Sequence, residues 1–333
     1  MLSASIDQVL ATLGVSLAYL LLVRLADVNE REPLWSVATA FVIGGAAAGA
    51  LFLGVDRATL FVGAWPGAVW REVSLAVALA VVFQVFRAVE RLQGWPLVAD
   101  PLDGLIYGAA AGLGFSCAET IATLAPDALF GPPNLLEFAG RSAVTGLAQG
   151  VFGALLGAGV GRAAGRQGLM RWIGPLVGLG LAVAAHGLHD VLAHGDALAG
   201  ESGVWRRQLA MGLPLVAVVG FAIFELLAER RAIARELAGE IASGDVTADE
   251  LSLLTQVPRR QRLYLSLLLR GRLAALRAVA AMHNQQAMLA LLTRRATGGD
   301  EASPARAARE LAAVRRAIRD SRARLSAASE VTQ

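Results

Sequence analysis

One glutamate lies inside a segment that is otherwise suited to hydrocarbon. Residues 112–121 read GLGFSCAETI, and Glu119 is the one charged residue among them. A carboxylate at membrane depth costs several kcal/mol unless a polar group answers it, and ionisable residues in such segments mark functional sites by default. Glu119 is therefore a candidate for chemistry, and it needs a partner from elsewhere in the chain.

The run AHGLHDVLAH at 185–194 offers that partner, because it holds three of the four histidines of the chain. His186 and Asp190 are one helical turn apart, and His189 shares their face of a helix. We expect Glu119 to face this pair across a helix interface. Gln149, in another apolar segment, joins them as a candidate because an amide is also costly to bury without a partner.

Two interpretations of this cluster stay open. Its side chains could carry out chemistry, or a hydrogen-bonded carboxylate could only fix the register of the helices. A metal site needs three ligands, and Glu119, His186 and Asp190 could supply them to a divalent ion such as Zn²⁺. The single cysteine, Cys117, excludes an internal disulfide and a multi-cysteine metal site.

Composition predicts the elements that must position these residues. The chain has 333 residues, of which 56% are hydrophobic and 17% charged, with a mean hydropathy of +0.55. A membrane span needs about 20 mostly apolar residues. Seven stretches qualify, so we predict an all-α membrane bundle of about seven spans: 9–25, 35–55, 67–89, 103–124, 141–161, 173–194 and 208–228.

The distribution of charge divides the chain near residue 228. Residues 1–228 hold 12 arginines and 16 acids, whereas 229–333 hold 18 arginines and 11 acids. We predict a membrane domain over 1–228 and a basic helical cytoplasmic tail over 229–333, with a capping box at Thr247 and Glu250. Acids interleave with the arginines of the tail, and it has one aromatic residue, so we expect the lipid bilayer rather than nucleic acid as its partner.

Arginines near the ends of the spans predict the orientation. Most of them fall on one side, including Arg24, Arg87, Arg162 and Arg230, and short loops rich in arginine stay cytoplasmic. We therefore expect the N-terminus outside and the tail inside.

Three stretches resemble the PrsW family of intramembrane proteases, which is related to the type II CAAX prenyl endopeptidases. They are DVNEREPLW (27–35), DGLIYGAAAGLGFSCAET (103–120) and HGLHD (186–190). The resemblance implies a protein of the bacterial plasma membrane that cuts membrane-associated peptides such as anti-sigma factors.

The resemblance also implies roles for particular residues. Members of the family carry the motifs EExxK, FxxxE, an arginine followed eight residues later by histidine, and HxxxD. Phe115 with Glu119 and His186 with Asp190 match two of them, which implies catalytic roles for the polar three and substrate binding for Phe115. Gln149 stands where the histidine of the third motif is expected, eight residues after Arg141, and could still donate a hydrogen bond in catalysis.

The residues of the first motif, EExxK, are replaced in this sequence. Counting back from Asp103 by the interval usual in the family puts EExxK on AVVFQ, so that Ala80, Val81 and Gln84 stand at its three defined positions. Glu72 lies about eight residues early, which is about 12 Å along a helix axis. We therefore expect no carboxylate from the third span in the site.

Three hypotheses follow from these residues. The first is a PrsW-like protease with a reduced site, and the second is a non-catalytic descendant that binds membrane segments as a scaffold or regulator. The third is a transporter with a proton relay. The sequence shows no inverted repeat, which would be typical of such a transporter. We favour reduced or lost activity, because hydrolysis needs a base and an oxyanion donor that alanine and valine do not supply.

Overall fold

The computed structural model describes residues 6–26, 32–55, 63–93, 96–98, 100–124, 135–164, 166, 168–194, 201–242, 244–297 and 304–330. These residues form helices and no strands, which confirms the all-α prediction. The helices are α1 (Ile6–Ala26), α2 (Leu34–Gly54), α4 (Ala64–Gln93), α5 (Pro101–Leu124), α6 (Leu135–Arg162), α7 (Met170–His194), α8 (Glu201–Glu240), α9 (Ala248–Thr255), α10 (Val257–Leu269), α11 (Leu273–Thr297) and α12 (Pro304–Glu330).

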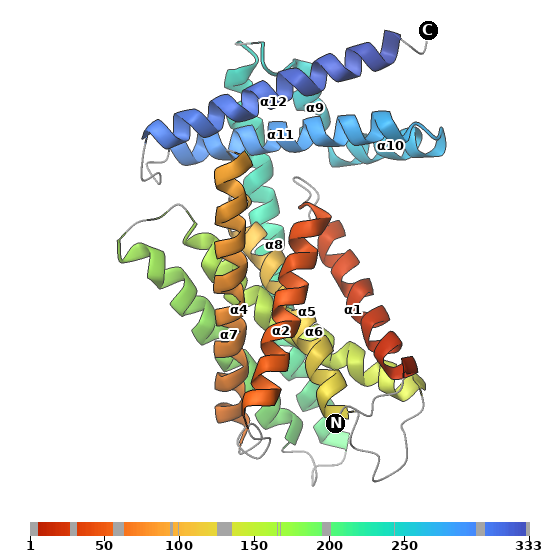
Figure 1. The fold of residues 1–333 in the computed structure, drawn as a ribbon, viewed down its shortest axis with the longest axis vertical. Coiled ribbons are helices and arrows are strands. Elements are labelled where there is room, and N and C mark those ends of the chain that lie inside the picture. Colours follow the sequence, from red (N-terminus) through yellow and green to blue (C-terminus); the bar gives the residue numbers. More distant parts are fainter. Residues whose placement is uncertain are drawn as a thin grey trace.

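Seven of these helices, α1, α2 and α4 to α8, are long and apolar enough to span a membrane. They lie side by side as a bundle (Figure 1). Each contains one of the seven stretches predicted from the sequence, although α4 and α8 continue beyond theirs. The chain is an integral membrane protein with a polytopic helical bundle.

Helix α5 is the centre of the bundle. In its spanning window 78% of the residues are buried, and α2 and α6 pack closely against it. Glycines permit this approach: a Cβ built on Gly112 would lie far inside 3.0 Å of the carbonyl oxygen of Gln149 on α6, and one on Gly108 equally close to that of Gly153. Small residues therefore bring the two backbones into contact, as expected for helices packed in lipid.

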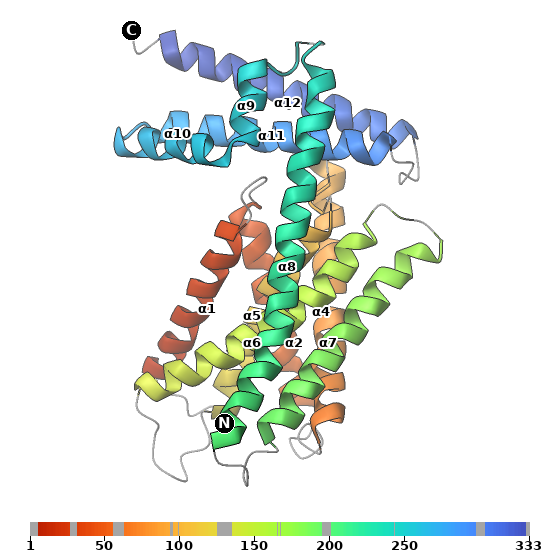
Figure 2. The same ribbon diagram turned by 180° about the vertical axis from the view of Figure 1, so that it is seen from behind.

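Helices α9 to α12 lie across one end of the bundle and, with the last turns of α8, form the C-terminal helical region (Figures 1 and 2). The predicted capping box is present, because Thr247 Oγ1 accepts from the amide of Glu250 and the carboxylate of Glu250 accepts from the amide of Thr247. This region has its own buried apolar cluster. Helix α8 runs without a break through residue 228, so the domain boundary there stays a prediction.

Candidate functional site

Helices α4 and α7 meet through a buried pair of polar side chains. His186 Nδ1 lies 2.7 Å from Oε1 of Glu72, and the side chains are 7% and 0% exposed. His186 Nε2 lies 3.5 Å from Oδ2 of Asp190, one turn further along α7. The imidazole is therefore held between two carboxylates.

An arginine joins the same two helices to α5. Arg71 Nε donates to Oε1 of Glu119 over 2.7 Å, and the NH1 nitrogen of Arg71 lies 3.6 Å from Oδ2 of Asp190. The Arg71 side chain is 8% exposed. The guanidinium of Arg71 therefore compensates the charge of Glu119 inside the bundle. Charge-assisted hydrogen bonds of this kind are about twice as strong as neutral ones.

Aromatic packing from α6 closes the site on another side. The ring of Phe152 stacks on His186 with centroids 4.8 Å apart, and its edge meets His189. Gln149 lies one turn before Phe152 and is buried. Two buried polar atoms of these helices have no hydrogen-bond partner among the described residues: Oε2 of Glu72 and Nε2 of Gln149.

The site lies at the end of the bundle that is remote from the C-terminal helical region. Arg71 and Glu72 are in the second and third turns of α4, whereas Glu119 and Asp190 lie near the last residues of α5 and α7. These ends meet at the lower side of the bundle in Figure 1, opposite α9 to α12. The polar side chains thus lie closer to that end of the bundle than to the end that carries the C-terminal helical region.

The site brings together three of the residues selected from the sequence, Glu119, His186 and Asp190, through Arg71 and Glu72. Gln149 is buried on the helix face that also carries Phe152, but its side-chain nitrogen finds no acceptor in the part of the chain that the structure describes. Phe115 is fully buried in the apolar core, so a contact with substrate would require the helices to part. The side chain of Arg141 lies outside the described residues, and the catalytic and binding roles remain predictions.

The expectation that the third span brings no carboxylate to the site is wrong, because Glu72 contacts His186. Depth along the helices explains the error. Glu119 lies about 18 residues, or 27 Å, into α5, and Glu72 lies about 21 residues, or 32 Å, before the end of the preceding α4. Helices α4 and α5 are antiparallel and are joined by the segment between residues 93 and 101, so Glu72 and Glu119 lie at one level. Ala80 lies about 12 Å nearer to that segment along α4.

Arg71 is the second residue that sequence reasoning missed. The sequence did contain a signal for it. Arg71 lies next to Glu72 at the same depth in the bundle as Glu119, and a carboxylate inside a membrane bundle requires a partner. If the pattern EExxK is aligned on Glu72, it falls on REVSL (71–75), with Arg71 at its first position, Glu72 at its second and Leu75 at its fifth.

A family model described as PrsW family intramembrane metalloprotease matches residues 32–228. The chain belongs to the PrsW family. The match covers α2 to α7 and the spanning part of α8, and therefore every residue of the site. No curated protein and no solved structure matches the chain.

A metal is implied by the description of the PrsW family, and the donor set of this chain does not fit one as arranged. Among the described residues, no three histidine, cysteine or acidic side chains are placed to hold an ion together. The physical reason is Arg71, which contacts both Glu119 and Asp190. The expected ligands Glu119, His186 and Asp190 lie in one site, but Arg71 stands between its two acids.

Proposed function

We propose that this chain uses the PrsW-family bundle to bind membrane-associated peptides, with hydrolysis reduced or lost. The observation that carries this proposal is the contact of 2.7 Å between Arg71 and Glu119. Peptide hydrolysis needs a base to activate water. Oε1 of Glu119 already accepts a charge-assisted hydrogen bond from Arg71, so this oxygen of the carboxylate is engaged by the guanidinium and is less available to a water molecule.

The sequence pattern supports the same proposal. The resemblance to the family implies two adjacent glutamates in the first motif, and here the first of them is replaced by an arginine whose charge has the opposite sign. A negative charge is thereby exchanged for a positive one, and Arg71 pairs with Glu119 and Asp190 instead of adding a third acid beside them. A bundle that keeps its shape and loses its base is suited to holding a peptide, as a scaffold or regulator does.

A second candidate function has one specific observation in its favour. Glu72 and His186 form a close pair, and Oε2 of Glu72 has no hydrogen-bond partner among the described residues. A carboxylate–imidazole pair of this kind can take a proton from water and pass it to a leaving amine. In this alternative the chain is a peptidase whose base is Glu72, and Arg71 is the donor that stabilises a developing oxyanion.

Orientation decides which membrane face a peptide would come from. Arginines close to the ends of α1, α4 and α6 lie on the side of the C-terminal helical region (Figure 2). Arginine in short loops favours the cytoplasm, which supports a cytoplasmic C-terminal helical region in a bacterial plasma membrane. Peptides such as the membrane segment of an anti-sigma factor would then reach the site from the outer face.

The proposal is tested with the full-length protein in detergent and a set of transmembrane peptides. One arm measures binding by photo-crosslinking, and the other measures cleavage by mass spectrometry. The variants Glu72→Gln and His186→Ala give the level of cleavage that does not depend on the site. We expect crosslinked peptide in the wild type and no cleavage above that of the two variants. Cleavage by the wild type that both substitutions abolish would establish the peptidase instead, and absence of any crosslink would remove the binding function.

A further inference from the structure

A long segment of the C-terminal helical region carries arginine and no acid. Residues 251–299 contain eight arginines and neither aspartate nor glutamate, although acids are frequent directly before and after this segment. The segment comprises most of α9, all of α10 and α11 and the turn between the last two. We call α10 and the first half of α11, residues 257–281, the basic hairpin.

The basic hairpin exposes large apolar side chains as well. Four leucines at and near its tip are between 49% and 77% exposed: Leu265, Leu268, Leu269 and Leu273. Leucines of α11 nearer to α8 are instead buried, as Leu289 and Leu292 are. Within α10 and α11, the exposed leucines therefore lie in the part that projects beyond α8 (Figure 1).

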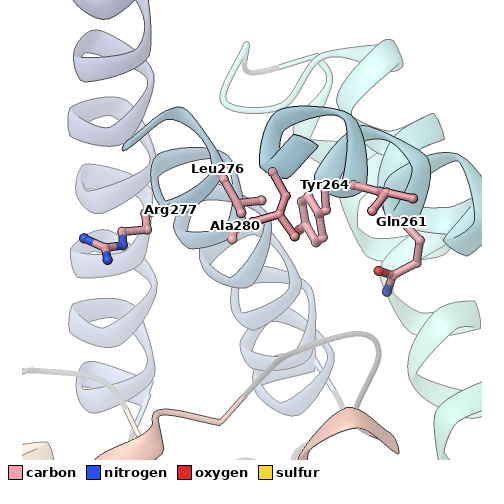
Figure 3. A pocket seen from close by; sticks show the side chains of 7 residues that line it. Gln261, Tyr264, Leu276, Arg277 and Ala280 are labelled. Atoms are coloured by element: carbon pink, nitrogen blue, oxygen red, sulfur yellow. The ribbon is translucent and has the colours of Figure 1, made fainter. Parts of the chain in front are cut away.

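The turn at the tip presents both kinds of side chain together. It reads LRGRL at 269–273, and Gly271 has a φ of 67°, a conformation that other residues adopt only with strain. Two leucines thus flank two exposed arginines. Behind the tip, an open groove between α10 and α11 is lined by Tyr264, Leu276 and Ala280 among others (Figure 3).

The hairpin lies just beyond the end of the apolar part of α8. The apolar part of α8 ends at Ala228, and α11 packs against Ile233 and Leu237, about 7 to 14 Å further along the helix. The headgroup layer of a bilayer is about 5 to 8 Å thick on each side. Helix α12 covers α11 on the side away from the bundle, and α10 extends over the side of α1 (Figures 1 and 2).

We propose that the basic hairpin is a membrane-docking element that binds anionic lipid headgroups. The exposed leucines enter the boundary between headgroups and acyl chains, and the exposed arginines, Arg262, Arg270 and Arg272 among them, bind lipid phosphates. This is the arrangement of an interfacial amphipathic element, with an apolar surface bordered by cations. The partner is a lipid surface because the segment has no acid to repel phosphate and lies where α8 places it beside the bilayer.

The test uses the full-length chain, with Cys117→Ala to remove the native thiol. A cysteine placed at Leu269 carries an environment-sensitive fluorophore, and the protein is reconstituted into nanodiscs of phosphatidylcholine with or without phosphatidylglycerol. A cysteine at Ala312, exposed on α12, is the matched control position. We expect a blue shift and quenching by spin-labelled lipid at 269, both stronger with the anionic lipid, and neither effect at 312.

A charge variant separates lipid binding from simple proximity. Arg270→Gln together with Arg272→Gln should abolish the effect of phosphatidylglycerol at 269, whereas Arg309→Gln with Arg316→Gln on α12 should leave it unchanged. An unquenched, water-exposed probe at 269 in both lipids would overturn the proposal. A blue shift without quenching by lipid would also overturn it, because a protein or a second copy of the chain would then cover the leucines.

Discussion

Arg71 of α4 and Glu119 of α5 form a salt bridge of 2.7 Å between two helices of a membrane bundle. The guanidinium also approaches Asp190 of α7 within 3.6 Å. Three helices are therefore joined through one cation. This pair offsets the cost of placing Glu119 in an apolar segment, and it occupies Oε1 of that carboxylate.

Removal of the cation alone should destabilise the bundle. Arg71→Met removes this ion pair from a carboxylate that is only 18% exposed, and we expect a loss of about 3 kcal/mol in the free energy of unfolding. Arg71→Met combined with Glu119→Gln should recover most of this loss, because both charges are then absent. Chemical unfolding in detergent measures both, and an undiminished stability of the single variant would contradict a buried pair.

Contact between the backbones of α5 and α6 predicts a strong effect of one methyl group. Gly112→Ala places a Cβ against the carbonyl of Gln149, so we expect a loss of about 2 kcal/mol or more as the helices move apart. Gly180→Ala on α7 is the matched control, since no atom lies within 4 Å of its added Cβ. Thermal unfolding should separate the two, and equal midpoints would argue against the close approach.

The seven spans were predictable from the sequence because a bilayer fixes the length of an apolar helix. The site was predictable only in part. Glu119 and the His186–Asp190 pair stand out in apolar segments, but Arg71 and Glu72 lie among the first turns of a long helix, where charged residues often reach the membrane surface. The residues of α4 that lie level with Glu119 are found by counting from the connection between α4 and α5 in both directions. Counting the residues between motifs does not find them.

Stability of the C-terminal helical region should fall in acid because of His283. Burial, and then the charge of Arg260, lowers the pKa of His283 from 6.5 to about 4, and its Nδ1 lies 2.8 Å from the hydroxyl of Tyr264. Between pH 6.5 and pH 4 the imidazole of His283 is protonated in the unfolded chain and neutral in the folded chain. The stability that is present above pH 6.5 is therefore lost as the pH falls towards 4.

At pH 4.5 this loss amounts to about 2 to 3 kcal/mol. Urea unfolding followed by a fluorophore on α12 at pH 7 and pH 4.5 measures it. His283→Gln serves as the control because it cannot titrate, and the difference between the two proteins isolates the histidine from the carboxylates. A wild type whose pH dependence equals that of His283→Gln would contradict a buried neutral imidazole.

The central claim is that Arg71 holds this PrsW-family site in a form that does not hydrolyse peptides. Cleavage of one transmembrane peptide by the wild type and by Arg71→Glu, followed by mass spectrometry in the same detergent, tests it most directly. The account predicts no cleavage by the wild type and measurable cleavage once glutamate stands beside Glu72 and frees Glu119. Cleavage by the wild type that Arg71→Glu abolishes would contradict it, because Arg71 would then take part in catalysis.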